Sequence, residues 1–331
     1  MSITVETSAP ITAPRRAEWL RFVTDFHNQT VFAHVGNWVI TTYAFLAGAA
    51  FLVGCTTALW LDAMAGHDVA RAARLHLLIT MPAIFLGLRV TTILTELPDL
   101  WRRPLQTIVR PGYMLHGGIF GGALGVTIVS QITGVGTLFY FDCAVLALTV
   151  GETIARIGCH VYGCCWGRPT RGCIGIRYTS PDASVIRNRP ELLGVKLHPA
   201  QLYSSLYSFG LFMLVLWLLP FKYFDGMLAA VYCIVHSVGR FGLERLRNDN
   251  LGRIGLRWTH TNLYSAVLFI GGVGLFAFGS ALPDTPIDLS VRWITVVRDA
   301  AVMRWVVAFG CFFFFVYGVH YKKVGSWVSS R

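Results

Sequence analysis

The sequence predicts an all-α, polytopic membrane protein of seven or eight transmembrane helices, with a small extramembrane head inserted between helices four and five. Hydrophobic residues make up 54% of the 331 residues and charged residues only 14%, whereas a soluble domain carries about 25% charged residues. The mean hydropathy is +0.56. Apolar runs recur along the chain, and about 20 apolar residues are enough to cross the hydrocarbon core as a helix.

Each expected span is one of these apolar runs. Seven lie near residues 38–60, 75–95, 113–130, 136–157, 200–219, 227–246 and 262–282, and an eighth is expected near 301–320. Residues 38–282 would form the membrane core, and 283–331 a C-terminal extension. Residues 1–37 would form an N-terminal interfacial segment. There, Trp19, Phe22 and Phe26 alternate with Arg16 and Arg21, which suits an amphipathic helix or a lead-in to the first span.

The head is expected at about residues 160–198, the one long polar stretch of the chain. It contains the turn-forming sequences Arg-Pro-Thr, Thr-Ser-Pro-Asp and Arg-Asn-Arg-Pro, which interrupt helices. A short strand is expected within residues 173–178. The stretch therefore predicts a small folded insertion outside the bilayer.

The chain carries a formal net charge of +11. In a membrane protein the simplest partner for this charge is an anionic lipid surface, and no nucleic-acid-binding module is visible. The basic residues gather in three loops, at about 102–110, 160–198 and 245–257, which share one side of the membrane in this topology. The positive-inside rule would place these loops in the cytoplasm.

Two arginines lie where a membrane protein tolerates them least. Arg156 and Arg240 each close a long apolar run, and a guanidinium at membrane depth is costly unless it has a partner or a polar cavity. Guanidinium is also the side chain best shaped to bind phosphate with two parallel hydrogen bonds. These arginines therefore predict an enzyme that acts on a phospholipid head group.

A histidine in a glycine-rich turn is the candidate proton acceptor. His116 precedes Gly117 and Gly118, where the backbone can approach a ligand closely and a neutral imidazole can accept a proton. A structural role for this single histidine is the alternative. The glycines that follow, Gly121, Gly122 and Gly125, are expected to pack against a neighbouring helix.

The second arginine heads a charged helical stripe. Arg240 and Glu244 are spaced as an i, i+4 pair, and Arg247 lies about one turn further on. A structural ion pair is the alternative, but three charged groups on one stripe favour a polar cavity within the membrane.

These motifs, in this order, resemble the prolipoprotein diacylglyceryl transferase family over roughly residues 38–282. Tyr43, Arg89 and Asp142 match residues of its spans. The other matching motifs are His116-Gly117-Gly118, Arg156-Ile-Gly, Trp166-Gly167-Arg168, His198-Pro-Ala-Gln201-Leu-Tyr and Arg240-x-x-x-Glu244-x-x-Arg247. The resemblance implies a catalytic role for His116, Arg156 and Arg240. It implies substrate binding by Tyr43, Arg89, Gly117, Gly118, Gly167, His198, Gln201, Glu244 and Arg247.

The resemblance also implies the reaction. A diacylglyceryl group would pass from phosphatidylglycerol to the lipobox cysteine thiol of a preprolipoprotein, so that a thioether forms and glycerol phosphate leaves. The protein would be a multi-pass protein of the bacterial cytoplasmic (inner) membrane with its head outside, opposite to the side indicated by the basic loops. No cofactor is expected.

Departures from the family pattern cluster near the expected active site. Cys159 replaces an asparagine, Cys164 replaces a glutamate, and Ser204 stands where the family has a glutamate after Tyr203. They favour a paralogous lipid-modifying transferase with a different acceptor as one alternative. A non-catalytic protein that binds anionic lipid is another.

The cysteines near Arg156 are candidates for chemistry. Cys159, Cys164 and Cys165 are candidate reactive thiols, because nearby arginines favour the thiolate. A disulfide is the alternative if the loop faces an oxidising compartment. A zinc site with His160 is a further alternative, but the cluster lacks Cys-x-x-Cys spacing, so no metal site is expected. The four cysteines within the spans are expected to be small core residues.

Overall fold

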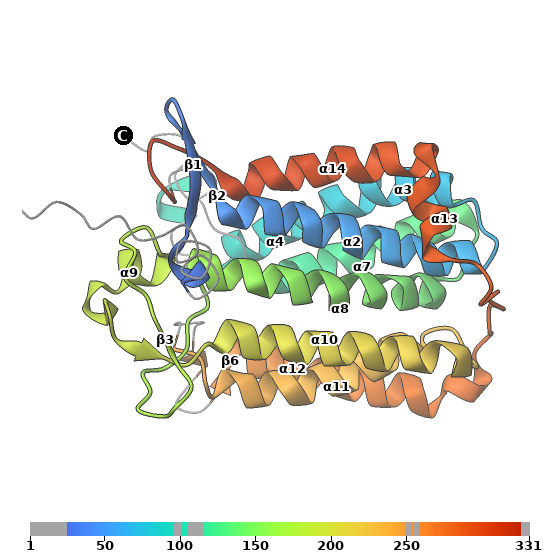
Figure 1. Ribbon diagram of the computed structural model, residues 1–331. Helices are drawn as coiled ribbons and strands as arrows, with labels where there is room; N and C mark the ends of the chain where they lie inside the picture. Colours follow the sequence, from blue (N-terminus) through green and yellow to red (C-terminus); the bar gives the residue numbers. More distant parts are fainter. Residues whose placement is uncertain (1–24, 96–100, 105–114, 249–252, 255–257, 326–331) are drawn as a thin grey trace, which may run out of the picture.

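The computed structural model describes residues 25–95, 101–104, 115–248, 253–254 and 258–325. Within these ranges the protein is mostly helical, and its long helices run alongside one another (Figure 1). They are α2 (Thr42–Met64), α3 (Val69–Leu75), α4 (Met81–Thr95), α7 (Leu115–Thr133), α8 (Thr137–Tyr162), α10 (Ala200–Leu218), α11 (Met227–Glu244), α12 (His260–Ala277) and α14 (Ala300–Gly318). A π-helical turn, His76–Thr80, joins α3 to α4.

Each expected span coincides with one of these helices, and the chain is a polytopic membrane protein. Among the described residues, five helical stretches are long and apolar enough to cross a membrane: Thr42–Met64, Val69–Thr91, Thr137–Tyr162, Ala200–Phe221 and Ala300–Gly318. Gly117–Thr133 and Thr261–Ala277 are shorter apolar helices. Large apolar side chains such as Ile270 and Leu206 are more than 70% exposed, as a lipid-facing surface requires.

Helix α8 is the centre of the bundle. It packs against α2 on one side and α10 on the other, while α4 packs on α7, α11 on α12 and α14 on α2 (Figure 1). The α8–α10 contact includes a hydrogen bond of 2.7 Å from the Ser205 hydroxyl to the Thr153 carbonyl. The core of the bundle therefore holds α8 and α10 in register near their head-proximal ends.

An aspartate on α8 fixes the start of α11. Asp142 is fully buried, and its carboxylate accepts hydrogen bonds of 2.8 Å from the backbone N–H groups of Gly226 and Ala229. An acceptor at this position satisfies N–H groups that have no partner within the helix. With its N-terminus held there, α11 runs toward the opposite end of the bundle, where Arg240 lies.

Glycines bring α4 and α7 into close contact, as the sequence predicts for Gly121, Gly122 and Gly125. A Cβ atom at Gly121 would overlap the Ala83 carbonyl, and one at Gly125 would lie 2.6 Å from the Thr80 Cα atom. Gly117 and Gly118 belong to the same interface: Gly117 meets the Gly87 carbonyl, and Gly118 meets Leu88. Small residues at such positions allow helix backbones to approach.

The described part of the N-terminal segment is not the expected amphipathic helix. Phe26–Asn28 is a 3-10 turn, and β1 (Val31–Val35) pairs antiparallel with β2 (Trp38–Thr41). Gly36 makes the hairpin turn with φ of 58°. The β-branched and aromatic residues of this stretch favour a strand, and a glycine at positive φ suits a tight hairpin. The rest of the expected helix, before residue 25, lies outside the described residues.

The C-terminal extension packs into the same bundle. After the short helix α13 (Trp293–Arg298), α14 lies along α2, and β7 (Val319–Tyr321) pairs antiparallel with β2. Val296, Val302 and Val306 are buried with Leu59 of α2. The phenylalanine-rich helix thus covers the outer side of α2.

The insertion between α8 and α10 lies at one end of the bundle (Figure 1). It contains β3 (Ile176–Arg177), α9 (Ser184–Asn188), a 3-10 turn (Pro190–Leu192) and β4 (Lys196–Leu197), which pairs with β3. β3 lies within the expected strand. Tyr178, Val185 and Leu197 form a fully buried core. The same end of the bundle carries the short hairpin of β5 (Arg253–Ile254) and β6 (Trp258–Thr259).

Candidate active site

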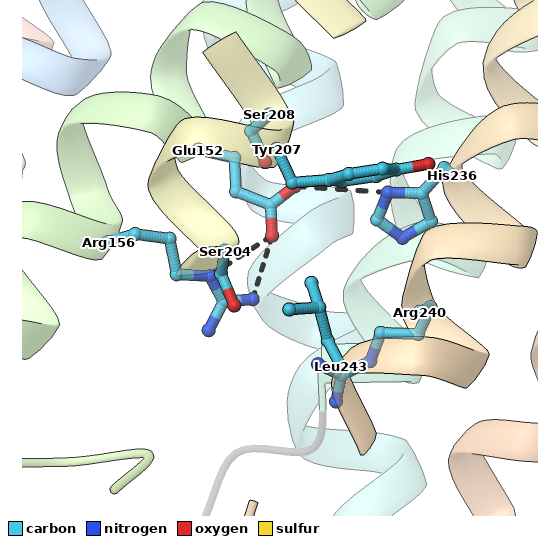
Figure 2. A pocket seen from close by; sticks show the side chains of 8 residues that line it. All are labelled: Glu152, Arg156, Ser204, Tyr207, Ser208, His236, Arg240 and Leu243. Atoms are coloured by element: carbon cyan, nitrogen blue, oxygen red, sulfur yellow. Dashed lines mark hydrogen bonds and ion pairs between the residues drawn. The ribbon is translucent and has the colours of Figure 1, made fainter. Parts of the chain in front are cut away.

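A small pocket of about 10 Å³, lined mainly by polar and charged side chains, lies between α8, α10 and α11. Figure 2 shows its lining side chains, which converge from the three helices. They are Glu152 and Arg156 of α8, Ser204, Tyr207 and Ser208 of α10, and His236, Arg240 and Leu243 of α11. Arg156 and Arg240, far apart in the sequence, therefore share one chamber.

The first arginine is held by a carboxylate one helical turn away. The Glu152 Oε1 atom accepts hydrogen bonds from Arg156 Nε at 3.1 Å and from Arg156 Nη2 at 2.7 Å. The two side chains are only 14% and 23% exposed. A buried guanidinium needs such a partner. Because the carboxylate binds Nε and Nη2, the Nη1 group of Arg156 can still donate to an anion.

The second arginine repeats this arrangement on α11. Arg240 Nη2 lies 3.2 Å from Glu244 Oε2, and both side chains are largely buried. Arg240 also interacts electrostatically with Arg156 and with Arg247. The three guanidinium groups outnumber the two carboxylates, Glu152 and Glu244, that pair with them. The remaining positive charge suits the binding of an anionic group such as a phosphate.

The sequence patterns did not single out five of the lining residues. Two of these five are titratable and lie beside the arginines, Glu152 and His236. His236 Nδ1 lies 4.0 Å from Glu152 Oε2 (Figure 2), and the His236 ring stacks on Tyr232 with centroids 4.9 Å apart. A signal was present, because each of these residues lies four positions before a selected arginine and therefore on the same helix face.

Ser204 is also in the chamber. It lines the cavity from α10, and its hydroxyl donates to the Ala200 carbonyl at 2.9 Å. The sequence singled it out as a departure from the family pattern. The serine that departs from the family pattern therefore lines the pocket in which a ligand would bind.

Among the side chains that the structure describes, those of several other expected site residues do not line this chamber. Arg89 on α4 is half-buried and does not line the cavity. Gly117 and Gly118 pack against α4, and a substrate contact for them stays a prediction. His116 lies in the first turn of α7, and its side chain lies outside the described residues.

The Trp166-Gly167-Arg168 motif links the head to the end of α11. Arg168 N–H donates to the Leu246 carbonyl at 2.9 Å, and Asn248 N–H donates to the Trp166 carbonyl at 3.1 Å. A Cβ atom at Gly167 would overlap the His198 carbonyl, so the motif needs glycine for this close approach. Arg247 follows α11 and is buried. The motif therefore fixes the backbone around Arg247.

The remaining expected residues surround the cysteines at the end of α8. Tyr43 of α2 packs over Gly158 and interacts electrostatically with Cys159, Cys164 and Cys165. Gln201, fully buried, donates from Nε2 to the Cys164 carbonyl at 2.7 Å. The His198 ring lies near Tyr203, with centroids 6.3 Å apart.

All eight cysteines are free thiols in the structure. The pKa of the Cys165 thiol lies well below its ordinary value, because the thiols of Cys159 and Cys164 hydrogen-bond to it and because Arg247 and Arg156 lie nearby. His160, the imidazole considered for a metal site, packs instead against His27, with ring centroids 5.5 Å apart.

Over most of its length the chain is similar to a known protein family. The model of the prolipoprotein diacylglyceryl transferase family matches residues 30–278. Phosphatidylglycerol–prolipoprotein diacylglyceryl transferase 2 of Clostridium perfringens is 31% identical over 242 residues, which cover 72% of this chain and 90% of that protein. The corresponding protein of Clostridium tetani is 30% identical over 195 residues, covering 58% of this chain and 74% of its own length. The chain belongs to the prolipoprotein diacylglyceryl transferase family.

Proposed function

We propose that this protein transfers the diacylglyceryl group of phosphatidylglycerol to the lipobox cysteine thiol of a preprolipoprotein. The observation that supports this most directly is the shared chamber of Arg156 and Arg240, each paired with a carboxylate one turn away. The relatives carry the name of this activity. Family membership and the two buried arginines point to the same substrate chemistry.

In the reaction, the acceptor sulfur forms a bond to the terminal glyceryl carbon while the bond from that carbon to the phosphate oxygen breaks. The oxygen keeps the electron pair and leaves as glycerol phosphate. Arg156 and Arg240 would bind the phosphate and stabilise its developing charge. Glu244 and Arg247 would orient the head group, as would Arg89 from α4.

The acceptor thiol must lose its proton, because a free cysteine with a pKa of about 8.5 is mostly protonated at neutral pH. We assign this proton to His116, which the sequence places beside Gly117 and Gly118. His236 would instead hold Glu152, whose carboxylate orients Arg156. Tyr43, Gly167, His198 and Gln201 would shape the side of the site nearest the head.

We further propose seven or eight membrane spans in the bacterial cytoplasmic membrane, with the head outside the cytoplasm. Cys173 is exposed in the head. A membrane-impermeant thiol reagent applied to intact spheroplasts should therefore label the wild-type protein at Cys173. The Cys173→Ser variant should not be labelled at this position. Labelling only after the membrane is opened would place the head in the cytoplasm.

The decisive assay incubates the purified protein with phosphatidylglycerol and a lipobox peptide and detects the thioether by mass spectrometry. Arg156→Gln and Arg240→Gln should each lower kcat/KM by about 10²–10³, the usual cost of losing one donor to a developing oxyanion. Arg74→Gln is the matched control, because Arg74 is exposed on α3. Wild-type rates in both chamber variants would overturn the assignment.

A second candidate is a paralogous transferase with another acceptor. Ser204 lines the chamber, Cys159 interacts with Arg156 and Tyr43, and Cys164 interacts with Tyr43. The departures from the family pattern therefore lie in or beside the proposed site. Expression of this protein in cells that lack their ordinary transferase distinguishes the two candidates. Restored lipoprotein processing supports transfer to the lipobox cysteine. Consumption of phosphatidylglycerol without restored processing supports a transferase with another acceptor.

A further inference from the structure

Three cysteine thiols meet at the end of α8. The Sγ atoms of Cys159, Cys164 and Cys165 all lie within 4.8 Å of one another. Cys159 is in the last turn of α8, and the other two follow in the turn that leaves it. The three thiols form one group, hereafter the thiol cluster.

Two residues with positive φ bring these thiols together. Helix α8 ends at Gly163, with φ of 73°, whose N–H donates to the Cys159 carbonyl at 2.9 Å. Cys165 has φ of 55°, a left-handed conformation that is unfavourable for a residue with a side chain and is concentrated at ligand and active sites. Gln201 holds the intervening Cys164 carbonyl at 2.7 Å. The hydrogen bond to the Cys159 carbonyl and the hydrogen bond from Gln201 together fix the conformation of this turn.

The spacing suits a soft metal ion. With Zn–S bonds of about 2.3 Å, two thiolates on a tetrahedral ion lie roughly 3.8 Å apart. The present limit of 4.8 Å therefore needs only small side-chain movements. Three sulfurs without a carboxylate select Zn²⁺ or Cu(I) over the hard ions Mg²⁺ and Ca²⁺.

The surroundings offset the charge that such a site would carry. Three thiolates around a divalent ion have a net charge of −1, and two buried guanidinium groups lie close enough to compensate it. Arg156 interacts with Cys159 and Cys165, and Arg247 interacts with Cys165. A structural zinc site has four protein ligands, whereas three ligands with an open fourth position are typical of catalytic zinc.

We propose that Cys159, Cys164 and Cys165 form a binding site for a thiophilic metal ion, with Zn²⁺ as the expected ion, and that its open position takes the acceptor thiol. The second part rests on the proposed function. The three cysteines each release a proton to water when the ion binds, and a coordinated acceptor thiol releases a fourth. The resulting thiolate attacks the glyceryl carbon, and the phosphate leaves with the electron pair, so no oxidant or reductant is needed.

The sequence predicts no metal site here, because the cysteines lack Cys-x-x-Cys spacing. The positive φ at Gly163 and Cys165 brings together thiols whose linear spacing is not typical of zinc sites.

The binding test uses the full-length protein in detergent, reduced and freed of metal, and then titrated with Co²⁺ or Zn²⁺. We expect one ion per chain by elemental mass spectrometry. In the Co²⁺ sample we also expect a thiolate-to-cobalt charge-transfer band. Cys159→Ser, Cys164→Ser and Cys165→Ser should each weaken binding at least tenfold. Cys173→Ser and Cys311→Ser are the controls, because both thiols are exposed and lie outside the cluster.

Any of three results would overturn the metal site. The first is the absence of a charge-transfer band in the wild-type protein, and the second is equal binding after all three substitutions. The third is a disulfide within the cluster under reducing conditions, seen as a loss of two mass units. Elution of each variant as a monodisperse peak at the wild-type volume shows that weakened binding is not unfolding.

The acceptor role has its own readout. Adding a lipobox peptide to the Co²⁺ protein should shift the absorption spectrum, and a peptide with serine in place of cysteine should not. An unchanged spectrum would refute the acceptor role while leaving the metal site in place. If the spectrum shifts but no thioether forms with phosphatidylglycerol, the proposed function fails and the metal site stands.

Discussion

Gln201 at the start of α10 and Cys164 in the turn after α8 are joined directly, since the Gln201 amide donates to the Cys164 carbonyl at 2.7 Å. The same amide lies 3.3 Å from the Tyr178 hydroxyl in the core of the head. One side chain therefore connects the thiol cluster, the head and α10.

Gln201→Leu should loosen this connection. A buried carbonyl without its donor costs about 1–3 kcal/mol, so the unfolding midpoint in detergent should fall and Cys165 should react faster with an alkylating reagent. Gln131→Leu, at an exposed position on α7, is the matched control. Identical alkylation rates in the two variants would argue against the connection.

The two histidines should give different kinetic signatures. His116→Gln should lower kcat by about 10²–10⁴, the usual contribution of a general base, and should remove the rise in rate with increasing pH. His236→Gln should mainly raise KM for phosphatidylglycerol, because His236 lies 4.0 Å from the carboxylate that holds Arg156. The reverse pattern would assign the proton transfer to His236.

Gly117→Ala should disrupt the contact between α4 and α7. Its methyl group would overlap the Gly87 carbonyl, and overpacking of this kind costs about 1–3 kcal/mol. Gly210→Ala on α10 is the control, because a Cβ atom there meets nothing within 4 Å and alanine is favoured over glycine in a helix. A thermal scan in detergent should show a lower midpoint for Gly117→Ala only.

Lys222 should make stability sensitive to alkali. Its side chain is 1% exposed and lies 2.7 Å from Asp225 and 2.6 Å from Asp284. Burial lowers its pKa, but hydrogen bonds to these two carboxylates outweigh this and raise the pKa above the ordinary value of 10.5. A raised pKa in the folded state means that the ion pairs contribute fully below pH 10.5 and that this contribution is lost as the pH rises through the folded-state pKa.

The corresponding measurement compares wild type with Lys222→Met. The difference in unfolding midpoint should be constant from neutral pH to about 10.5 and should shrink above it. Removing one partner of a buried pair costs about 3–5 kcal/mol, and the lower end is expected because Asp284 is 42% exposed. Lys323→Met, at an exposed lysine, should change little. A difference that does not depend on pH would contradict the ion-pair explanation.

The sequence by itself determined the helices and the two principal arginines. Hydropathy is summed over neighbouring residues, so each expected span coincides with a helix, and an arginine that closes an apolar run is conspicuous without any structure. The relation of Arg240 to Glu244 also follows from the 3.6-residue period of one helix.

Only the tertiary structure decided which residues meet across helices. His236 reaches Glu152 because α11 is fixed against α8 by Asp142, a contact between residues far apart in the sequence. The thiols converge because Gly163 and Cys165 take positive φ, which their spacing does not reveal. Residues 31–35 form a strand partly because β2 also pairs with β7 at the other end of the chain. In each case packing between distant segments overrides or completes a local preference.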